Sequence, residues 1–193
     1  LTLGAYGDVD FFTFKGTVEA ILRDLRVSDV TFRACQDDPS YHPGRCAMVY
    51  ASGHFVGMMG QIHPLVAQNF GVDAELYCAE LPLTALMAAK GADPEYVPLP
   101  RFPSVQRDIA VVCGEAVTVG QLEETIRKGA RGLLKKVELF DIYTGAPIPA
   151  GKKSVAFNLT LRSDEKSLTA EEADEDVKSI LAQLEKELGA VLR

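Results

Sequence analysis

The segment SVAFNLTLR (residues 154–162) decides the fold of the C-terminal half of the chain, because its apolar and polar side chains alternate without interruption. In an extended strand, residues two apart point to the same face. One face therefore carries four large apolar side chains: Val155, Phe157, Leu159 and Leu161. The other face carries small or polar ones: Ala156, Asn158 and Thr160. This period of two predicts a strand with one buried face.

Two amphipathic helices are expected around this strand. Thr169 is followed three residues later by Glu172, a capping-box signature, and Gly189 is a typical helix end. Between them, apolar residues recur at helical spacing and form one stripe: Ala173, Val177, Ile180, Leu181, Leu184 and Leu188. Thr118 and Gln121 predict a second helix that runs to Lys128.

Three further strands complete the pattern of this half. Residues 107–113 place Ile109 and Val111 on one face, and residues 135–143 alternate Val137 and Leu139 with charged side chains. Residues 190–192 form a closing strand. The order is βαββαβ, which predicts a ferredoxin-like sandwich of the α+β class.

The N-terminal half predicts a largely antiparallel sheet with helices. A helix is expected over residues 13–26, a loop over 37–44, and helices over 64–70 and 82–90. The expected strands are residues 30–34, 46–51, 54–62 and 75–81, the middle two joined by the hairpin turn Ser52-Gly53. The predicted order is helix, strand, hairpin, helix, strand, helix.

A proline-rich segment separates the two halves. Pro94, Pro98, Pro100 and Pro103 lie within ten residues, so the segment cannot be helical and forms a stiff connector. We expect two domains, residues 1–97 and 98–193.

Composition narrows the function classes. The chain has 193 residues, is 47% hydrophobic and carries a net charge of −7, which argues against a surface that binds nucleic acid throughout. No apolar run approaches the roughly 20 residues that span a bilayer, so no membrane partner is expected. Residues 1–100 hold 6 Lys and Arg against 12 Asp and Glu, whereas residues 101–193 hold 14 against 15. The second half therefore has enough cations to form a basic face.

The basic residues of the second half are clustered in sequence. Arg127, Lys128, Arg131, Lys135 and Lys136 fall within ten residues, and Lys152-Lys153 flank the hairpin that follows. The cluster has two interpretations, a solvated loop or a phosphate-binding face. Acidic residues gather instead at the N-terminus of the last helix, where the helix dipole stabilises them.

Cysteine and histidine residues do not form a catalytic or metal-binding motif. The four cysteines, Cys35, Cys46, Cys78 and Cys113, include no CxxC pair, and their positions in alternating strands favour buried thiols. The three histidines, His42, His54 and His63, have no metal-ligand spacing. A pair such as Cys46 with His42 or His54 leaves a small Cys/His enzyme as an alternative.

Several motifs in series resemble one known family. Four runs of this chain resemble the ferredoxin-fold anticodon-binding domain that ends the β chain of bacterial phenylalanyl-tRNA synthetase. They are RFPSVQRDIA (101–110), LFDIYTG (139–145), IPAGKKSVAF (148–157) and SLTAEE (167–172). Three other runs of this chain resemble the synthetase-like module of the same β chain: VDFFTFKG (9–16), HPGRCA (42–47) and GQIHP (60–64).

This resemblance implies a class II synthetase-like, non-catalytic module followed by an anticodon-binding domain. The complete family enzyme is an α2β2 phenylalanine–tRNA ligase that uses ATP and magnesium in the cytoplasm. Its catalytic site lies on the α chain, and its editing domain with magnesium-binding acids lies upstream of Leu1. This fragment is therefore expected to have no catalytic residue, metal or cofactor of its own. Its expected partners are the α chain and phenylalanine tRNA, not DNA.

We assign tRNA binding to five cations: Lys135, Lys136, Lys152, Lys153 and Arg162. Phe140 and Tyr143 are candidates for stacking on unpaired bases, with core packing as the alternative. For the whole chain, the alternatives are a purely structural protein–protein module and the Cys/His enzyme.

Overall fold

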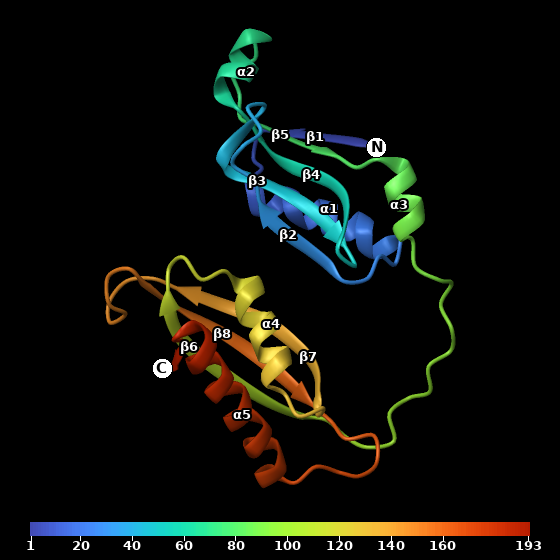
Figure 1. Cartoon of the computed structure of the whole chain (residues 1–193), viewed down its shortest axis with the longest axis vertical. Coiled ribbons are helices and arrows are strands. Elements are labelled where there is room, and N and C mark those ends of the chain that lie inside the picture. Colours follow the sequence, from blue (N-terminus) through green and yellow to red (C-terminus); the bar gives the residue numbers. More distant parts are fainter. The chain divides into compact units, whose positions relative to one another are not determined.

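The structure is a computed structural model that describes residues 1–193, and it divides into two compact units, Leu1–Glu95 and Tyr96–Arg193 (Figure 1). Each unit has its own sheet and its own hydrophobic core. We describe each unit by itself.

The first unit is a five-stranded, wholly antiparallel sheet with three helices. Its strands have the order β1-β5-β4-β3-β2, and each pairs with its neighbours in the antiparallel sense. The strands are β1 (Thr2–Tyr6), β2 (Val30–Ala34), β3 (Tyr41–Ala51), β4 (His54–Ile62) and β5 (Leu76–Glu80). The helices are α1 (Phe11–Asp24), α2 (Pro64–Asn69) and α3 (Leu83–Ala89). The largely antiparallel sheet is confirmed.

The core of this unit lies between α1 and one face of the sheet. Phe14, Val18 and Leu22 recur at helical spacing and are buried against strand residues such as Val49 and Met59. Asp10 begins α1, because its side chain accepts a hydrogen bond from the backbone N–H of Thr13. A second, smaller cluster lies elsewhere in the unit and is formed by three buried residues: Cys35, Tyr41 and Cys46.

Two expectations for this unit are wrong. The predicted order lacks strand β1, a segment of only five residues interrupted by Gly4, which pairs with β5 from Thr2↔Glu80 to Tyr6↔Leu76. Residues 41–44 belong to β3 and not to a loop, despite Pro43 and Gly44. The register of β3 against β4 shifts between Tyr41 and Cys46, so the strand passes through an irregularity that admits these residues.

The second unit has the predicted βαββαβ order. Its strands are β6 (Val105–Gly114), β7 (Leu134–Tyr143), β8 (Lys152–Leu161) and β9 (Val191–Leu192), and its helices are α4 (Val119–Gly129) and α5 (Ala170–Leu188). The sheet order is β7-β8-β6-β9, all antiparallel. This arrangement is the ferredoxin-like topology, and the predicted α+β class is confirmed.

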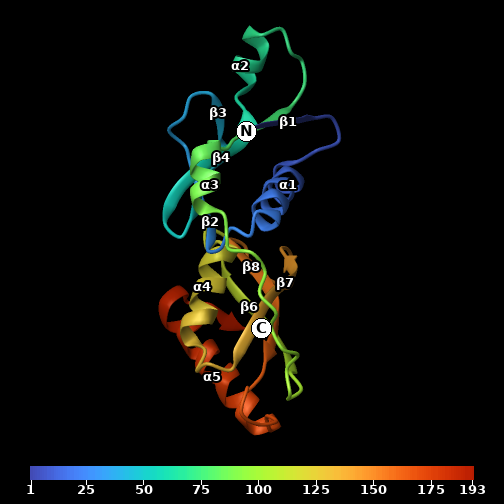
Figure 2. The ribbon, with the colours of Figure 1, turned by 90° about the vertical axis from the view of Figure 1, so that its right-hand side faces the viewer.

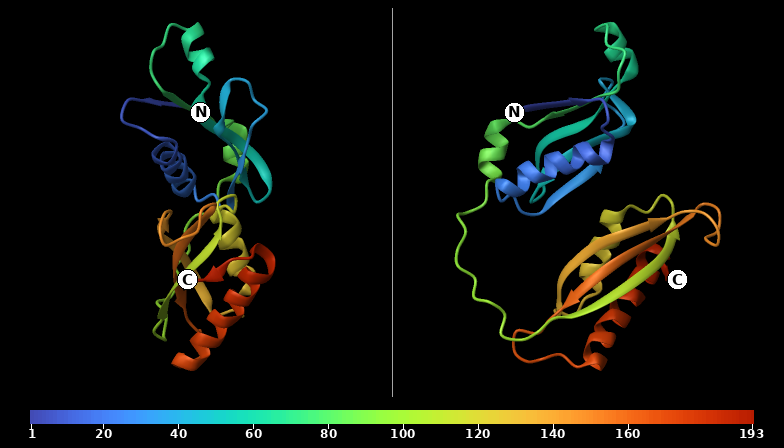
Figure 3. Two further views of the ribbon diagram at one scale, coloured as in Figure 1. Left: turned by 90° about the vertical axis from the view of Figure 1, so that its left-hand side faces the viewer. Right: turned by 180° about the vertical axis from the view of Figure 1, so that it is seen from behind.

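Both helices of the second unit cover the same face of its sheet (Figure 2). The view from behind shows the strands of this sheet with the helices beyond them, so the opposite face carries no helix (Figure 3). Both capping boxes form: Thr118 with Gln121 begins α4, and Thr169 with Glu172 begins α5. Gly189 ends α5 with φ +59°, a conformation that glycine adopts without strain.

The buried layer of the second unit follows from the alternation in β8. The four apolar residues of β8, Val155, Phe157, Leu159 and Leu161, are each fully buried. The first three pack in one core with Leu122 and Ile126 of α4 and with Ile180 and Leu184 of α5. The expectation for β7 is only partly right. Val137 is buried, but Leu139 is 40% exposed, next to a bulge where the register against β8 shifts between Leu139 and Asp141.

Residues between α3 and β6 form neither helix nor strand. The first of them are fastened to the first unit, where the Arg26 guanidinium pairs with Asp93 at 2.9 Å and the N–H of Gly91 donates to Leu25. None of the helices is long and apolar enough to span a bilayer.

Gly129 sets the approach of α4 to α5. A Cβ at this position would lie 2.9 Å from Cα of Ile180 and 3.0 Å from Cβ of Gln183, closer than side chains pack. We expect Gly129→Ala to lower the free energy of unfolding by about 1–3 kcal/mol, because the helices must move apart. Urea unfolding followed by circular dichroism measures this change.

Gly120, in the same helix, provides the matched control. A Cβ there meets nothing within 4 Å, so Gly120→Ala should be neutral or stabilise the helix by up to about 1 kcal/mol. Equal effects of the two substitutions would contradict the close approach at Gly129.

Candidate nucleic-acid interface

The helix-free face of the second unit is built from rows of side chains that cross β7, β8 and β6. Because directly paired residues of antiparallel strands point to the same side, the strand registers identify each row. The four rows are Tyr143–Ser154–Val112, Asp141–Ala156–Ala110, Glu138–Asn158–Asp108 and Lys136–Thr160–Gln106. Strand β9 extends the first row with Val191.

Short side chains occupy the middle of this face. Ser154 is 3% exposed and Ala156 is 8% exposed, although no helix covers them. On β7 they pair with the longer side chains of Tyr143 and Asp141, and on β6 they pair with Val112 and Ala110. The part of the face on β8 therefore has short side chains, which form a floor next to the longer side chains of β7. A flat aromatic group fits beside such an edge.

Tyr143 stands at that edge and is 40% exposed. Its hydroxyl donates to the backbone oxygen of Ala146 at 2.6 Å, which holds the ring in place. The guanidinium carbon of Arg193 lies 5.9 Å from the ring centroid, and the N–H of Arg193 donates to Ala110, so the terminal residue lies along the same face. The structure thus provides a fixed aromatic ring next to a cation.

Phe140, the other stacking candidate, lies in the β7 bulge and is 60% exposed. Neither ring belongs to the buried core cluster of the second unit, so core packing is wrong as their role. Tyr143 differs from Phe140 in that its position is fixed by a hydrogen bond and by a strand pair.

The charge on this face is mostly negative. It presents the carboxylates of Asp108, Glu138 and Asp141, while Lys136 pairs with Glu138 at 2.7 Å. The amide of Asn158 donates to Asp108 at 2.7 Å. Carboxylates repel phosphates but accept hydrogen bonds from the amino and imino groups of bases. The face therefore suits unpaired bases better than a phosphate backbone.

The five predicted tRNA-binding cations do not form one cluster. Lys135, Lys136 and Arg162 lie where β7 begins and β8 ends, and Lys135 and Arg162 both contact Asp164, at 2.7 and 3.3 Å. These contacts lower the pKa of the Asp164 carboxyl, chiefly through the hydrogen bond from Lys135.

Lys152 and Lys153 lie at the opposite end of β8, paired with Gly114 and Cys113. A strand rises about 3.3 Å per residue, so roughly 30 Å separates them from Arg162. Lys152 lies on the helix-free side of the sheet, as Ser154 does, whereas Lys153 pairs with the core residue Cys113 and lies on the helix-covered side. The five cations therefore lie at the two ends of β8 and not all on one face.

Two of the remaining residues of the sequence cluster make local contacts, Lys128 through its side chain and Arg131 through its backbone. Lys128 pairs with Glu124 at 2.9 Å along α4, which raises the pKa of the lysine and lowers that of the glutamate. The backbone N–H of Arg131 donates to Asp176 at 2.6 Å. The continuous basic surface suggested by the sequence is thus divided among several contacts.

Histidine and cysteine side chains of the first unit take part in local structure. His63 accepts a hydrogen bond from Leu65 as the N-cap of α2, and His42 accepts one from Gly44. Burial raises the pKa of the Cys46 thiol to about 12, with Cys35 as the second cause. A protonated, buried thiol is a poor nucleophile, so the geometry does not favour the Cys/His enzyme.

The fold and this face define a class of protein. Residues 100–193 match the family described as the ferredoxin-fold anticodon binding domain, and residues 3–83 match the family described as the phenylalanyl tRNA synthetase beta chain CLM domain. The second unit thus matches the ferredoxin-fold anticodon binding domain family over nearly its whole length and has its ferredoxin-like topology.

Curated relatives identify the family of the whole chain. It is 38% identical to the phenylalanine–tRNA ligase beta subunit of Clostridium tetani over 193 residues, 100% of the chain and 24% of that relative. Identity is 44% over 186 residues for the subunit of Halalkalibacterium halodurans and 42% over 185 for that of Bacillus subtilis, each 96% of the chain and 23% of the relative. The chain belongs to the phenylalanine–tRNA ligase beta subunit family, and it spans about a quarter of the length of these relatives.

Sequence reasoning did not identify the polar members of the helix-free face. Asp108, Asp141 and Ser154 were counted as ordinary strand residues, because only the register of three strands brings them together. The alternation in β8 already marked its outward residues, and this signal would have located the centre of the face.

The buried thiol of Cys46 gives a pH-dependent prediction. Its ordinary pKa is 9.0 and its folded pKa is about 12, so the folded state binds the proton more tightly than the unfolded state. The resulting stabilisation is complete below pH 9 and is lost as the pH rises from 9 to 12. We expect the stability difference between the natural chain and Cys46→Ala to be constant up to about pH 8 and to shrink above pH 9.

Urea unfolding at a series of pH values measures this difference. The comparison at pH 7 is the internal control, because it contains the packing effect of the substitution alone. A difference that stays constant to pH 11 would contradict the raised pKa.

Proposed function

We propose that the chain is the C-terminal part of a phenylalanine–tRNA ligase β subunit and that its second unit binds the anticodon region of phenylalanine tRNA. Residues 1–97 would end the synthetase-like module, and residues 98–193 would form the anticodon-binding domain. The helix-free face, with Tyr143 held beside a floor of short side chains, is the observation that carries the proposal.

Unpaired bases are the part of the anticodon loop that this face fits. A base stacked on Tyr143 would lie over Ser154 and Ala156, within reach of the Asp141 carboxylate. Stacking on an aromatic ring contributes about 1–3 kcal/mol per base. A carboxylate that accepts from a base edge adds selectivity, because the wrong base leaves it without a donor.

The five cations would hold the backbone on both sides of the bound bases. Lys135, Lys136 and Arg162 lie at one end of β8, and Lys152 and Lys153 lie at the other, where Lys152 is on the side of the helix-free face. Each phosphate neutralised adds about 0.7–0.9 to the dependence of log affinity on log salt.

The complete enzyme would provide the chemistry that this chain supports. In this proposal an α chain carries the catalytic site and uses ATP and Mg²⁺, and α and β chains assemble as α2β2 in the cytoplasm. The chain itself contributes binding surfaces, not a catalytic residue.

A structural role for the first unit has its own support. Six large apolar side chains of this unit are more than 60% exposed: Tyr6, Phe12, Leu65, Phe70, Leu83 and Met87. Surfaces of this kind are typical of contacts with another chain. A module that binds the α chain without tRNA is therefore the second candidate.

Removal of the aromatic ring tests the proposed stacking. We expect Tyr143→Ala to weaken binding of the phenylalanine anticodon stem-loop at least about fivefold, because one stacked base loses its partner. Tyr143→Phe keeps the ring and should bind within about twofold of the natural chain. Fluorescence anisotropy with a labelled stem-loop measures both. Equal affinity of the alanine variant and the natural chain would exclude Tyr143 from the site.

Charge reversal tests the groups at the two ends of β8 separately. Lys135→Glu with Lys136→Glu, and Lys152→Glu with Lys153→Glu, should each weaken binding and each lower the salt slope by about 1–2, the contribution of two phosphate contacts. Lys178→Glu, on the exposed side of α5, is the control and should have no effect. If neither double variant changes the slope, these lysines do not contact the tRNA.

A further inference from the structure

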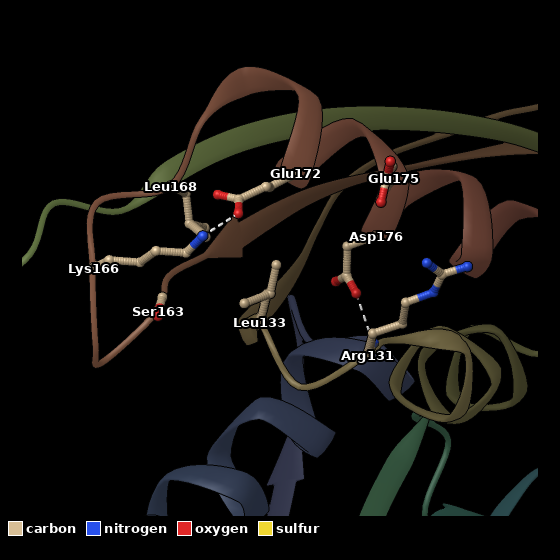
Figure 4. A pocket seen from close by; sticks show the side chains of 8 residues that line it. All are labelled: Arg131, Leu133, Ser163, Lys166, Leu168, Glu172, Glu175 and Asp176. Carbon is tan, nitrogen blue, oxygen red and sulfur yellow. Dashed lines mark hydrogen bonds and ion pairs between the residues drawn. The ribbon is translucent and has the colours of Figure 1, made fainter.

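A pocket of about 240 Å³ lies outside the helix-free face, where the loops that precede β7 and α5 meet the first turns of α5 (Figure 4). Its lining combines charged and apolar side chains: Arg131, Leu133, Ser163, Lys166, Leu168, Glu172, Glu175 and Asp176. At one side the Lys166 ammonium pairs with Glu172, and at the other the backbone of Arg131 meets Asp176 (Figure 4).

Asp176 is the unusual member of this lining. It is 1% exposed, so its carboxylate is withdrawn from bulk water. Its Oδ1 accepts the hydrogen bond from the backbone N–H of Arg131, whereas its Oδ2 accepts none from any group of the protein. Buried carboxylate oxygens are nearly always paired, and this unpaired one belongs to a residue that lines the pocket.

The charges of the pocket favour a cation as that donor. Three carboxylates, those of Glu172, Glu175 and Asp176, face two cationic side chains, Lys166 and Arg131. An anion would meet the unpaired oxygen of Asp176 and is excluded. No cluster of three metal-ligating side chains occurs in the structure, and the two neighbouring cations oppose a divalent ion.

The apolar lining defines the rest of the ligand. Leu133 lies between the two charged pairs and Leu168 lies beside the Lys166–Glu172 pair, and both provide a surface for methylene groups (Figure 4). Aliphatic amines and guanidines have this combination of an N–H-bearing cation and an apolar stem.

We propose that this pocket binds an alkylammonium or alkylguanidinium group, whose N–H donates to Oδ2 of Asp176 while its stem packs on Leu133 and Leu168. The group belongs either to a free aliphatic amine or to a lysine or arginine side chain of a partner protein. Glu175, on the same turn of α5, provides the second carboxylate. The site is separate from the proposed tRNA interface, so the two proposals can fail independently.

Titration of the 193-residue chain with n-butylammonium tests the proposal. Backbone amide shifts in two-dimensional NMR should saturate, with the largest changes at Arg131, Leu133 and Asp176. We expect Asp176→Asn to raise the dissociation constant at least about tenfold, since a hydrogen bond to a charged partner is lost. Tetramethylammonium, which has the charge but no N–H, should not produce saturable shifts.

Two further variants keep the test independent of folding. Glu175→Gln is exposed, removes a lining carboxylate and should weaken binding about threefold. Glu171→Gln, which removes the same charge outside the pocket, is the matched control and should change the constant by less than about twofold. Nonsaturable shifts, or equal affinity of the natural chain and Asp176→Asn, would show that the pocket holds water only and would overturn the proposal.

A parallel titration distinguishes the two sources of the group. Nα-acetyl-lysine methylamide presents the same ammonium on a peptide backbone. If it binds as tightly as n-butylammonium, the pocket accepts a partner's side chain; if only n-butylammonium binds, the ligand is a free amine. Failure of both would overturn the proposal and leave the tRNA-binding result unaffected.

Discussion

The alternation of side chains in β8 is the constraint on which the second unit depends. This strand lies inside the sheet, paired with β7 on one side and β6 on the other, so its register determines theirs. A slip of one residue would place Phe157 and Leu159 in water and Asn158 in the core. The burial of one face of β8 therefore also determines which side chains of all three strands lie on the helix-free face.

The helix-free face carries the strand side chains that point away from the core. On β7 and β6, the partners of the outward β8 residues include Asp108, Glu138 and Asp141, which could not be buried without donors. A surface with this composition binds little by charge alone, and its selectivity comes from hydrogen-bond donors that a base edge supplies. In the proposed complex, attraction of the phosphates would fall to the cations at the two ends of β8. Such a division of roles would reconcile an acidic chain with a nucleic-acid interface, because the net charge of −7 averages surfaces with different charge.

Signals within a few residues predicted most elements of the second unit. The features that were not predicted depend on contacts between residues distant in sequence. Both capping boxes, the burial of β8 and the end of α5 at Gly189 follow from side chains within a few positions, and all are found. The exposure of Leu139 follows from a bulge, which depends on the pairing of two strands and leaves no mark in the alternation of β7. Lys152 and Arg162 are near each other in sequence, but they lie at opposite ends of β8, a strand of ten residues, and are therefore far apart in space. Positions along a strand were therefore predictable, and the grouping of side chains across strands was not.

Two kinds of carboxylate in this unit differ in their need for a partner. Asp141 and Glu138 are exposed, so water satisfies them until a ligand displaces it, and a ligand must compensate for that loss. Asp176 is buried, and one of its oxygens lacks a donor from the protein. A ligand at Asp176 does not first have to remove a complete hydration shell from the carboxylate, so even a small cation with an N–H can gain a net interaction there. In these proposals the exposed carboxylates would discriminate among ligands already held by other contacts, while the buried one would provide the main polar contact of its ligand.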